Sequence, residues 1–512
     1  MEQIQHPEQR EPATAATGPA EGHRASPNGK EKATPSRRLV IPTPSLVVLI
    51  GPAGSGKSTF ARTHFRPTEV LSSDFFRALL TDSEADQSAS REAFALLHQV
   101  ADARLRRGKL TVIDATNTTA ESRAPLLALA QAHHLPAVAI IFDLPLRTCL
   151  AWDAARPERH VGAEVITRQH QQLQRNRGQI LREPFALREW IRSPEELMRC
   201  IVIRRPLDCD RRNLHGPFDI IGDVHGCLPE LLTLLDRLGY RVEQTTARDG
   251  QPRFRVRHPH GRKLVFVGDL TDRGPDSPNV LRLVMDAVEE RRALMVMGNH
   301  DRKLQRYLTG QDVLIAHGFE ITVAQLATEP PAFRERVRRF LAKLPNHLVL
   351  DGGRLVVAHA GLPEEYHGRS SPVVRRIALF GVTTGERDAQ GLPIRVNWAL
   401  DYRGRAIVVY GHTPVLTPVW VNQTIDIDTG CVFGNALTAL RYPELELVSV
   451  PAQRAYATPP RPLLQPEDLL KPILLPSADE ELSDEDAANL NEQERPAIPA
   501  TAVHQQRAES PE

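Results

Sequence analysis

The feature that most constrains the fold is a short apolar strand that ends abruptly in metal-binding side chains, at residues 220–226 (IIGDVHG). Asp223 and His225 lie two residues apart at its end, with a glycine on either side. Side chains placed in this way can turn toward one point and offer a carboxylate oxygen and an imidazole nitrogen to a divalent metal. For this segment alone, an aspartate that only caps the following helix is an equally ordinary interpretation.

Four further apolar strands run into a small residue and then into a metal-ligand type. In chain order they deliver Asp269, Asn299, His359 and His412. A set of five such strand ends favours a two-metal site over isolated structural histidines. Asp269 would bridge two ions about 3.5–4 Å apart. The first ion would take Asp223, His225 and Asp269, and the second Asp269, Asn299, His359 and His412.

The predicted site also contains a cation for the substrate. Arg273 follows Asp269 closely, and its guanidinium can bind two phosphate oxygens at once. Mixed oxygen and nitrogen ligation favours Mn²⁺, with Ni²⁺, Fe and Zn²⁺ as alternatives.

A phosphate-binding loop lies in the first half of the chain. Residues 46–50 (LVVLI) run directly into GPAGSGKS at 51–58, which matches G-x-x-x-x-G-K-[ST] between a strand and a helix. Backbone N–H groups of such a loop surround phosphate oxygens; the lysine reaches the β- and γ-phosphates of ATP, and the serine holds Mg²⁺. The motif therefore predicts these nucleotide-binding residues: Gly51, Gly54, Ser55, Gly56, Lys57, Ser58 and Thr59.

Polar residues at the next strand ends are candidates for phosphoryl transfer. Asp74 follows a strand expected at 69–72, and a carboxylate beside the γ-phosphate can accept the proton of an attacking hydroxyl. Its alternative role is a helix cap. A strand at 110–114 brings three polar residues to the same edge, either for acceptor or Mg²⁺ binding or for ordinary turn geometry: Asp114, Thr116 and Asn117.

The length predicts two or three domains, and short apolar strands that alternate with helical segments predict two α/β blocks in a soluble chain. The 512 residues carry a net charge of +1, so nucleic-acid binding would need local basic patches. Five cysteines without a CxxC motif, no signal peptide and no apolar run of membrane-spanning length favour a reduced, cytoplasmic protein without membrane contact. The expected organisation is a disordered tail at 1–38, a P-loop domain at 39–205, a linker at 206–217, a metal-binding domain at 218–450 and a disordered Pro-rich, acidic tail at 451–512.

Several motifs resemble those of one enzyme family. GDVHG, GDLTDRG, GNHD, a strand-borne histidine and GHTP resemble the calcineurin-like metallophosphoesterases. The strings at 261–275 and 427–434 are more specifically similar to the phosphatase module of bacterial polynucleotide kinase-phosphatases, and SSDxxR at 72–77, DATN at 114–117 and an arginine-bearing lid resemble the kinase module. The resemblance implies a P-loop kinase sheet with flanking helices, followed by a β-sandwich flanked by helices.

The same resemblance assigns roles to individual residues. In the kinase module it implies that Asp74 is the general base, that Arg77 lies near the acceptor, and that Arg156 and Arg159 are lid contacts. In the phosphatase module it implies that His300, oriented by Asp272, protonates the leaving oxygen, beside Arg273. It also places a further site contact at Asp426 or Asp428, a choice that the sequence leaves open.

The preferred function is healing of nucleic-acid ends, with RNA as the expected substrate. The first domain would phosphorylate 5′-OH ends with ATP and Mg²⁺, and the second would remove 3′-phosphate or 2′,3′-cyclic phosphate with two divalent metals. The chain ends in a polar tail rather than a ligase-like domain, so a separate ligase would seal the ends. The sequence leaves open whether the substrate is RNA or DNA. It also leaves open the oligomeric state, including whether the chain forms a homodimer.

Two other functions compete with this one. The first is a metallophosphatase for dinucleoside polyphosphates or phosphoproteins whose P-loop domain senses nucleotide. The second is a binding module in which the P-loop domain closes around ATP and recruits partners through the tails.

Overall fold

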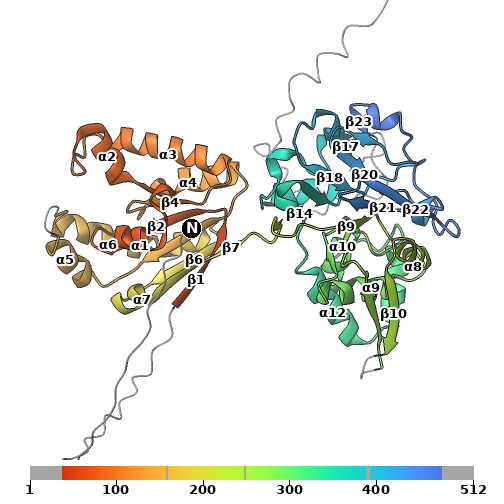
Figure 1. Cartoon of the computed structure of the whole chain (residues 1–512). Coiled ribbons are helices and arrows are strands. Elements are labelled where there is room, and N and C mark those ends of the chain that lie inside the picture. Colours follow the sequence, from red (N-terminus) through yellow and green to blue (C-terminus); the bar gives the residue numbers. More distant parts are fainter. Residues whose placement is uncertain (1–36, 157–159, 247–249, 388–392, 475–512) are drawn as a thin grey trace, which may run out of the picture.

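The computed structural model describes residues 37–156, 160–246, 250–387 and 393–474. Two α/β domains follow one another along the chain, each with its own sheets and helices (Figure 1). Among the described residues, no helix combines the length and the apolar character needed to cross a membrane.

The first domain is a parallel sheet with helices on both faces. Its five strands lie in the order β3-β4-β2-β5-β6, and every neighbouring pair is parallel. The strands are β2 (Leu46–Ile50), β3 (Val70–Ser72), β4 (Thr111–Asp114), β5 (Ala137–Phe142) and β6 (Leu187–Ile191). The helices are α1 (Lys57–His64), α2 (Ser73–Thr81), α3 (Ser90–Arg106), α4 (Ala120–Ala132), α5 (Leu146–Ala154), α6 (Ala163–Arg182) and α7 (Pro194–Arg199). The central strands β2 and β5 are wholly buried, as the continuous apolar runs predict for a sheet covered on both faces.

The two ends of this domain pair with each other. β1 (Arg37–Thr43) runs parallel to β7 (Cys200–Pro206), with Arg37 opposite Cys200. β1 therefore begins two residues inside the segment that the sequence assigned to a tail ending at residue 38. The predicted linker is also partly ordered: β8 (Asp210–Arg211) pairs with β14 (His347–Leu350) of the second domain.

The second domain is a β-sandwich with helices packed outside. One sheet has the order β13-β12-β9-β21-β22 and the other β19-β20-β18-β15-β14-β8. Buried side chains of both sheets, such as Ile220, Val265, Val357 and Val409, form the core between them. The two sheets use β9 (Phe218–Ile221), β12 (Lys263–Phe266), β13 (Ala293–Met295), β15 (Leu355–Ala358), β18 (Ile407–Tyr410), β19 (Trp420–Val421), β20 (Thr424–Asp426), β21 (Ala436–Tyr442) and β22 (Glu446–Pro451).

Helices and a hairpin cover the outer faces of this sandwich. A second apolar cluster joins the first sheet to helices α8 to α12. The helices are α8 (Leu228–Arg237), α9 (Ser277–Glu289), α10 (Asn299–Leu308), α11 (Phe319–Ala327), α12 (Pro331–Leu341) and α13 (Pro372–Phe380). β10 (Arg241–Thr246) and β11 (Pro252–Arg257) form an antiparallel pair, and β16 (Thr383–Arg387) pairs with β17 (Pro393–Val396).

The chain beyond β22 corrects one expectation. Residues from 451 onward were predicted to be a disordered tail, but residues 452–474 pack on the second domain and are called the C-terminal strap below. Leu469 is buried, and β23 (Ile473–Leu474) pairs with β17. Asn397 donates from its side-chain amide to the carbonyls of Leu469 (2.7 Å) and Lys471 (3.0 Å). The compositional argument failed because the strap obtains its hydrogen bonds from residues of the second domain that stand far from it in the sequence, such as Asn397.

Candidate metal centre and phosphate-binding loop

The predicted metal ligands converge where strands of both sheets end. β13, β12 and β9 are parallel neighbours in one sheet, and β15 and β18 are parallel neighbours in the other, so their carboxyl ends meet at one edge of the sandwich. The small residue before each ligand makes room for this approach. A Cβ atom added to Gly298 would overlap Asp269, and one added to Gly411 would overlap Asp223.

The backbone at this edge is unusual for residues other than glycine. His225, Asp269, Asp272, Arg273 and His412 have φ between 43° and 79°. Such conformations are uncommon for residues with a Cβ and cluster at functional sites. The strain indicates that the surrounding structure holds these side chains in place.

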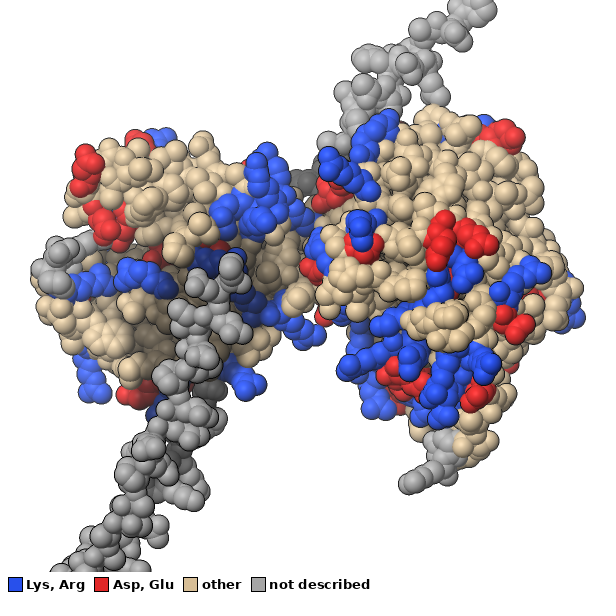
Figure 2. Space-filling model, in the orientation of Figure 1, with Lys and Arg blue, Asp and Glu red and all other residues tan. Residues whose placement is uncertain are grey.

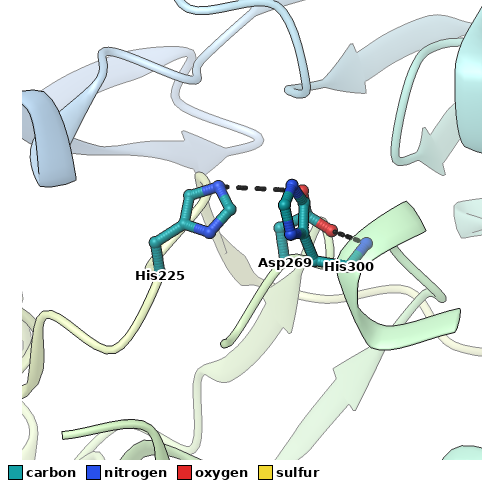
Figure 3. A group of neighbouring side chains, drawn as sticks. All are labelled: His225, Asp269 and His300. Carbon is teal, nitrogen blue, oxygen red and sulfur yellow. Dashed lines mark hydrogen bonds and ion pairs between the residues drawn. The ribbon is translucent and has the colours of Figure 1, made fainter. Parts of the chain in front are cut away.

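His225, Asp269 and His300 form one cluster of possible ligands, with ligand atoms within 4.8 Å of one another. Figure 3 shows His225 reaching toward Asp269 from one side, and the ring of His300 overlapping the Asp269 side chain in this view. His225 Nε2 lies 3.7 Å from Asp269 Oδ2, while His225 Nδ1 donates to the carbonyl of Thr271 (2.7 Å). That second bond fixes the tautomer and leaves the Nε2 lone pair facing the carboxylate.

Asp269, His359 and His412 form a second cluster around the same carboxylate. His359 Nε2 lies 3.3 Å from Asp269 Oδ2, and His359 Nδ1 contacts the carbonyl of Val267 (3.1 Å). Asn299 Oδ1 is 2.8 Å from His359 Nε2 and 3.1 Å from His412 Nδ1. Asp269 therefore belongs to both clusters, the position that a bridging ligand requires.

The donor set fits divalent cations. Asp223 Oδ1 is buried without a hydrogen-bond partner. Burial and the charges of Asp428 and Asp269 raise the pKa of Asp223 well above its usual value, because several carboxylates share one enclosed space. The residues that would hold two ions are those predicted from the sequence: Asp223, His225, Asp269, Asn299, His359 and His412. Ions bound there would neutralise these carboxylates and polarise a phosphoryl group.

Of the two aspartates that the sequence left open, Asp428 lines the cavity at the metal centre. Burial, followed by the charge of Asp269, raises its pKa to about 6. Asp426 lies behind it and accepts a hydrogen bond from the backbone of Asp428 (2.9 Å).

Arg273 lies between the two histidines at the open side of the centre. It donates from Nη1 to His225 Nε2 (3.0 Å) and from Nη2 to His300 Nε2 (3.0 Å). Asp272 Oδ2 is 2.5 Å from His300 Nδ1. Both ring nitrogens of His300 therefore have protein partners, as do those of His225; the difference is that His300 Nδ1 faces a carboxylate, whereas His225 Nδ1 faces a backbone carbonyl.

Two residues that sequence reasoning missed support the ligands. Asp301 Oδ2 accepts from the backbone N–H groups of Asp269 (2.8 Å) and Gly298 (3.1 Å). Arg395, on β17, is buried and contacts His412 Nε2. Asp301 stands in the GNHD motif and could have been found there, whereas nothing in the sequence around Arg395 signals a role.

The P-loop follows β2 as predicted. Gly54 and Gly56 have φ of 72° and 85°, and Gly56 caps α1. Lys57 donates to the carbonyls of Gly51 and Pro52 (both 2.8 Å), and burial lowers its pKa to about 8. Ser55 and Lys57 are buried, while Thr59 faces outward. Gln169 of α6 accepts a hydrogen bond from the Ala53 backbone (2.8 Å), a contact that the sequence did not indicate.

The residues that the sequence linked to phosphoryl transfer lie around this loop. The charge of Asp114 raises the pKa of Lys57 against the effect of burial, so Asp114 is a neighbour of the lysine. Asn117 instead has a structural role, because its amide donates to the carbonyl of Leu49 (2.8 Å). Ser72, rather than Asp74, caps α2.

Asp74 forms an ion pair with the buried side chain of Arg77, so these two predicted residues lie together. Arg156 lies near enough to Lys57 for its charge to lower the pKa of that lysine. The other predicted lid residue, Arg159, falls outside the described residues.

Comparisons with known proteins divide the chain in the same way. Residues 46–180 match a model described as AAA domain, and residues 216–448 match a model described as calcineurin-like phosphoesterase. The second region is similar to proteins named bis(5′-nucleosyl)-tetraphosphatase PrpE [asymmetrical]. The protein from Anoxybacillus flavithermus is 47% identical over 243 residues, which are 47% of this chain and 96% of the relative. The protein from Geobacillus thermodenitrificans is 49% identical over 238 residues, which are 46% of this chain and 94% of the relative. These matches do not include the P-loop domain.

Proposed function

The chain belongs to the calcineurin-like phosphoesterase family through its second domain, and we propose that this domain hydrolyses dinucleoside polyphosphates in a metal-dependent reaction. The observation that carries the proposal is the similarity to tetraphosphatases over 96% of a relative's length, in the region that holds both ligand clusters. From the sequence alone, this function was the first alternative to healing of nucleic-acid ends.

Besides the metal ions, hydrolysis needs groups that bind the phosphates and protonate the leaving oxygen, and side chains of this domain supply them. Water adds to one phosphorus, and the bond from that phosphorus to the bridging oxygen breaks. Asymmetric cleavage of a tetraphosphate would release a nucleoside triphosphate and a nucleoside monophosphate. Arg273 would bind phosphate oxygens in place of the two histidine nitrogens that it now contacts. His300, protonated at Nε2 and held at Nδ1 by Asp272, would give its proton to the leaving oxygen.

The direct test is product analysis with diadenosine tetraphosphate and Mn²⁺. We expect ATP and AMP as products of the wild-type chain and of Lys57→Ala. Asp269→Ala should form neither product, since both ligand clusters lose their shared carboxylate. An active Asp269→Ala variant, or a wild-type chain that leaves the dinucleotide intact, would contradict the proposal.

A second candidate is end healing of RNA or DNA, favoured by the position of Asp74. This aspartate is partly exposed, is not the helix cap and affects the pKa of Lys57 through its charge, as a general base near the γ-phosphate should. ATP with Mg²⁺ would serve the first domain, Mn²⁺ the second, and a separate ligase would act afterwards.

The mixture of basic and acidic side chains on the surface gives end healing less support. Figure 2 shows Lys and Arg gathered over the second domain with Asp and Glu among them. Arg336, for example, pairs with Asp286 and Glu289 (2.7 Å each). A nucleic acid binding at this residue would have to displace such pairs.

An oligonucleotide with a 5′-OH and a 3′-phosphate tests end healing, as RNA and as DNA. Labelling of the 5′ end that requires Asp74, with 3′ dephosphorylation that requires Asp269, would establish it. If phosphate is transferred neither to RNA nor to DNA, the P-loop domain would instead be a nucleotide sensor.

A further inference from the structure

We propose that Phe433 and the C-terminal strap form a nucleobase subsite beside the metal centre. The inference rests on the proposed function, since it identifies the part of a dinucleoside polyphosphate that the chain recognises apart from its phosphates. Residues matched by the phosphoesterase family model end at 448, before the strap begins.

One cavity joins the metal centre to the strap. Its volume is about 350 Å³, within the usual range for small-ligand sites. His225, Asp269 and Asn299 line one part of it, and the strap contributes Pro460, Pro462 and Leu463 to another. A ligand in this cavity therefore meets an ionic surface and an apolar surface at the same time, as a phosphate attached to a nucleoside requires.

Phe433 provides an aromatic face next to the phosphate-binding arginine. The guanidinium carbon of Arg273 lies 5.3 Å from the centre of its ring. Leu463 of the strap packs on the adjoining turn: a Cβ added to Gly430 would lie 2.9 Å from Leu463 and 3.6 Å from Phe433. Phe433 packs against the core but is partly exposed and lines the cavity, so the part of its ring that faces the cavity can stack on a base.

The strap is fixed relative to the metal ligands. Leu464 donates from its backbone to the carbonyl of Pro414 (3.0 Å) and accepts from Leu416 (2.8 Å). Pro414 lies two residues after His412, so the same loop holds a ligand and positions the strap. Farther along, Gln453 and Tyr456 bind Glu230 Oε1 of α8 (2.9 and 2.8 Å). A wall held at several points is preorganised for binding.

The charges in the cavity also fit a polyphosphate chain. Arg461 and Lys471 of the strap line it together with Arg273. Lys471 is paired with Asp468 (2.6 Å), and this exposed pair can open at little cost. Phosphates beyond the one at the metal centre would therefore meet positive charge. A phosphotyrosine peptide would use the aromatic face but not this extended cationic wall, which is why a nucleotide is the better occupant.

The experiment compares a substrate that has bases with one that has none. The metal-loaded full chain is assayed with diadenosine tetraphosphate and with inorganic tripolyphosphate. Phe433→Ala should raise the KM for the dinucleotide roughly 10- to 100-fold, the loss expected for one base–aromatic stack. The KM for tripolyphosphate should not change, and Phe433→Trp should retain dinucleotide binding.

Leu470→Ala is the matched control. Leu470 belongs to the strap, is 65% exposed and does not line the cavity, so both KM values should stay as in the wild type. Equal losses for both substrates in Phe433→Ala would mean that Phe433 acts by positioning Arg273, and would overturn the subsite. An unchanged KM for the dinucleotide would overturn it as well.

A binding measurement separates the subsite from the proposed reaction. The chain already has four tryptophans, and Trp152 lies beside Gly56 of the P-loop. In a Lys57→Ala background, AMP but not ribose 5-phosphate should therefore quench the fluorescence of Phe433→Trp more than that of the chain that keeps Phe433. This result would support the subsite even if dinucleoside polyphosphates proved not to be substrates. Absence of quenching by AMP would overturn it whatever the substrate is.

Discussion

Asp272 and His300 form the shortest link between a carboxylate and an imidazole at the metal centre, with 2.5 Å between Asp272 Oδ2 and His300 Nδ1. Thr322 donates to the other oxygen of Asp272 (2.7 Å). Although burial opposes it, the hydrogen bonds from His300 and Thr322 lower the pKa of Asp272. An ionised Asp272 holds the His300 ring in one orientation through this contact.

The first prediction concerns proton donation by this pair. His300→Gln should reduce kcat about 10²- to 10⁴-fold for substrates with poor leaving groups, because the leaving oxygen then departs without a proton. The loss should be much smaller for 4-nitrophenyl phosphate, whose leaving group needs no proton. Metal content, measured by mass spectrometry, should equal that of the wild type. Equal losses for both substrates would argue that His300 has a different role.

The second prediction concerns Asp301. Its Oδ2 accepts from the backbone of Asp269 and Gly298, and its Oδ1 accepts from the backbone of Leu270 (3.2 Å). An asparagine would therefore turn an N–H group toward at least one of these donors. Asp301→Asn should weaken metal affinity roughly 10- to 100-fold, as loss of an outer-shell partner does. Titration of the metal-free chain with Mn²⁺ measures this change. Asp312→Asn, at an exposed carboxylate, is the control and should bind as the wild type does.

The third prediction concerns the backbone of the P-loop. Gly54 has φ of 72°, and a Cβ there would overlap the carbonyl of Cys149. Gly54→Ala should lower the free energy of unfolding of the first domain by roughly 1–3 kcal/mol and weaken ATP binding. Gly178→Ala is the matched comparison, since Gly178 lies inside α6 with nothing within 4 Å of an added Cβ. It should stabilise the domain by about 0.5–1 kcal/mol. Thermal unfolding with and without ATP distinguishes the two.

The fourth prediction is a pH dependence of stability caused by His347. This buried ring accepts a hydrogen bond from the Gly368 backbone at Nε2 (3.0 Å), and burial lowers its pKa from 6.5 to about 3. The unfolded chain therefore binds the proton more readily than the folded one below pH 6.5. Stability is complete above that pH and should fall by about 1.4 kcal/mol for each pH unit toward 3.

Urea unfolding of the metal-free chain at neutral pH and at about pH 5 measures this slope. His347→Gln should have a shallower slope, since the group that titrates is gone. The same slope in both proteins would assign the acid sensitivity to other residues.

The sequence by itself determined the elements whose signals are local. The P-loop needs glycines and a lysine at fixed spacing between β2 and α1. Asp223, His225 and Asp269 stand within four residues of the ends of β9 and β12, which finish in apolar residues. The carboxyl ends of neighbouring parallel strands meet at one edge, so strand order along the chain was enough to predict that these ligands converge. Strand β2 has the predicted bounds, because its continuous apolar run is also a local signal.

Only the tertiary structure decided the contacts between distant segments. It placed Asp428 rather than Asp426 at the cavity, brought Arg395 against His412, and folded the strap over the metal centre. The strap has the composition of a flexible tail, and its order comes from partners such as Asn397 and Pro414. A sequence pattern records which groups a segment can offer, whereas hydrogen bonds and burial across the fold decide which of those groups are used.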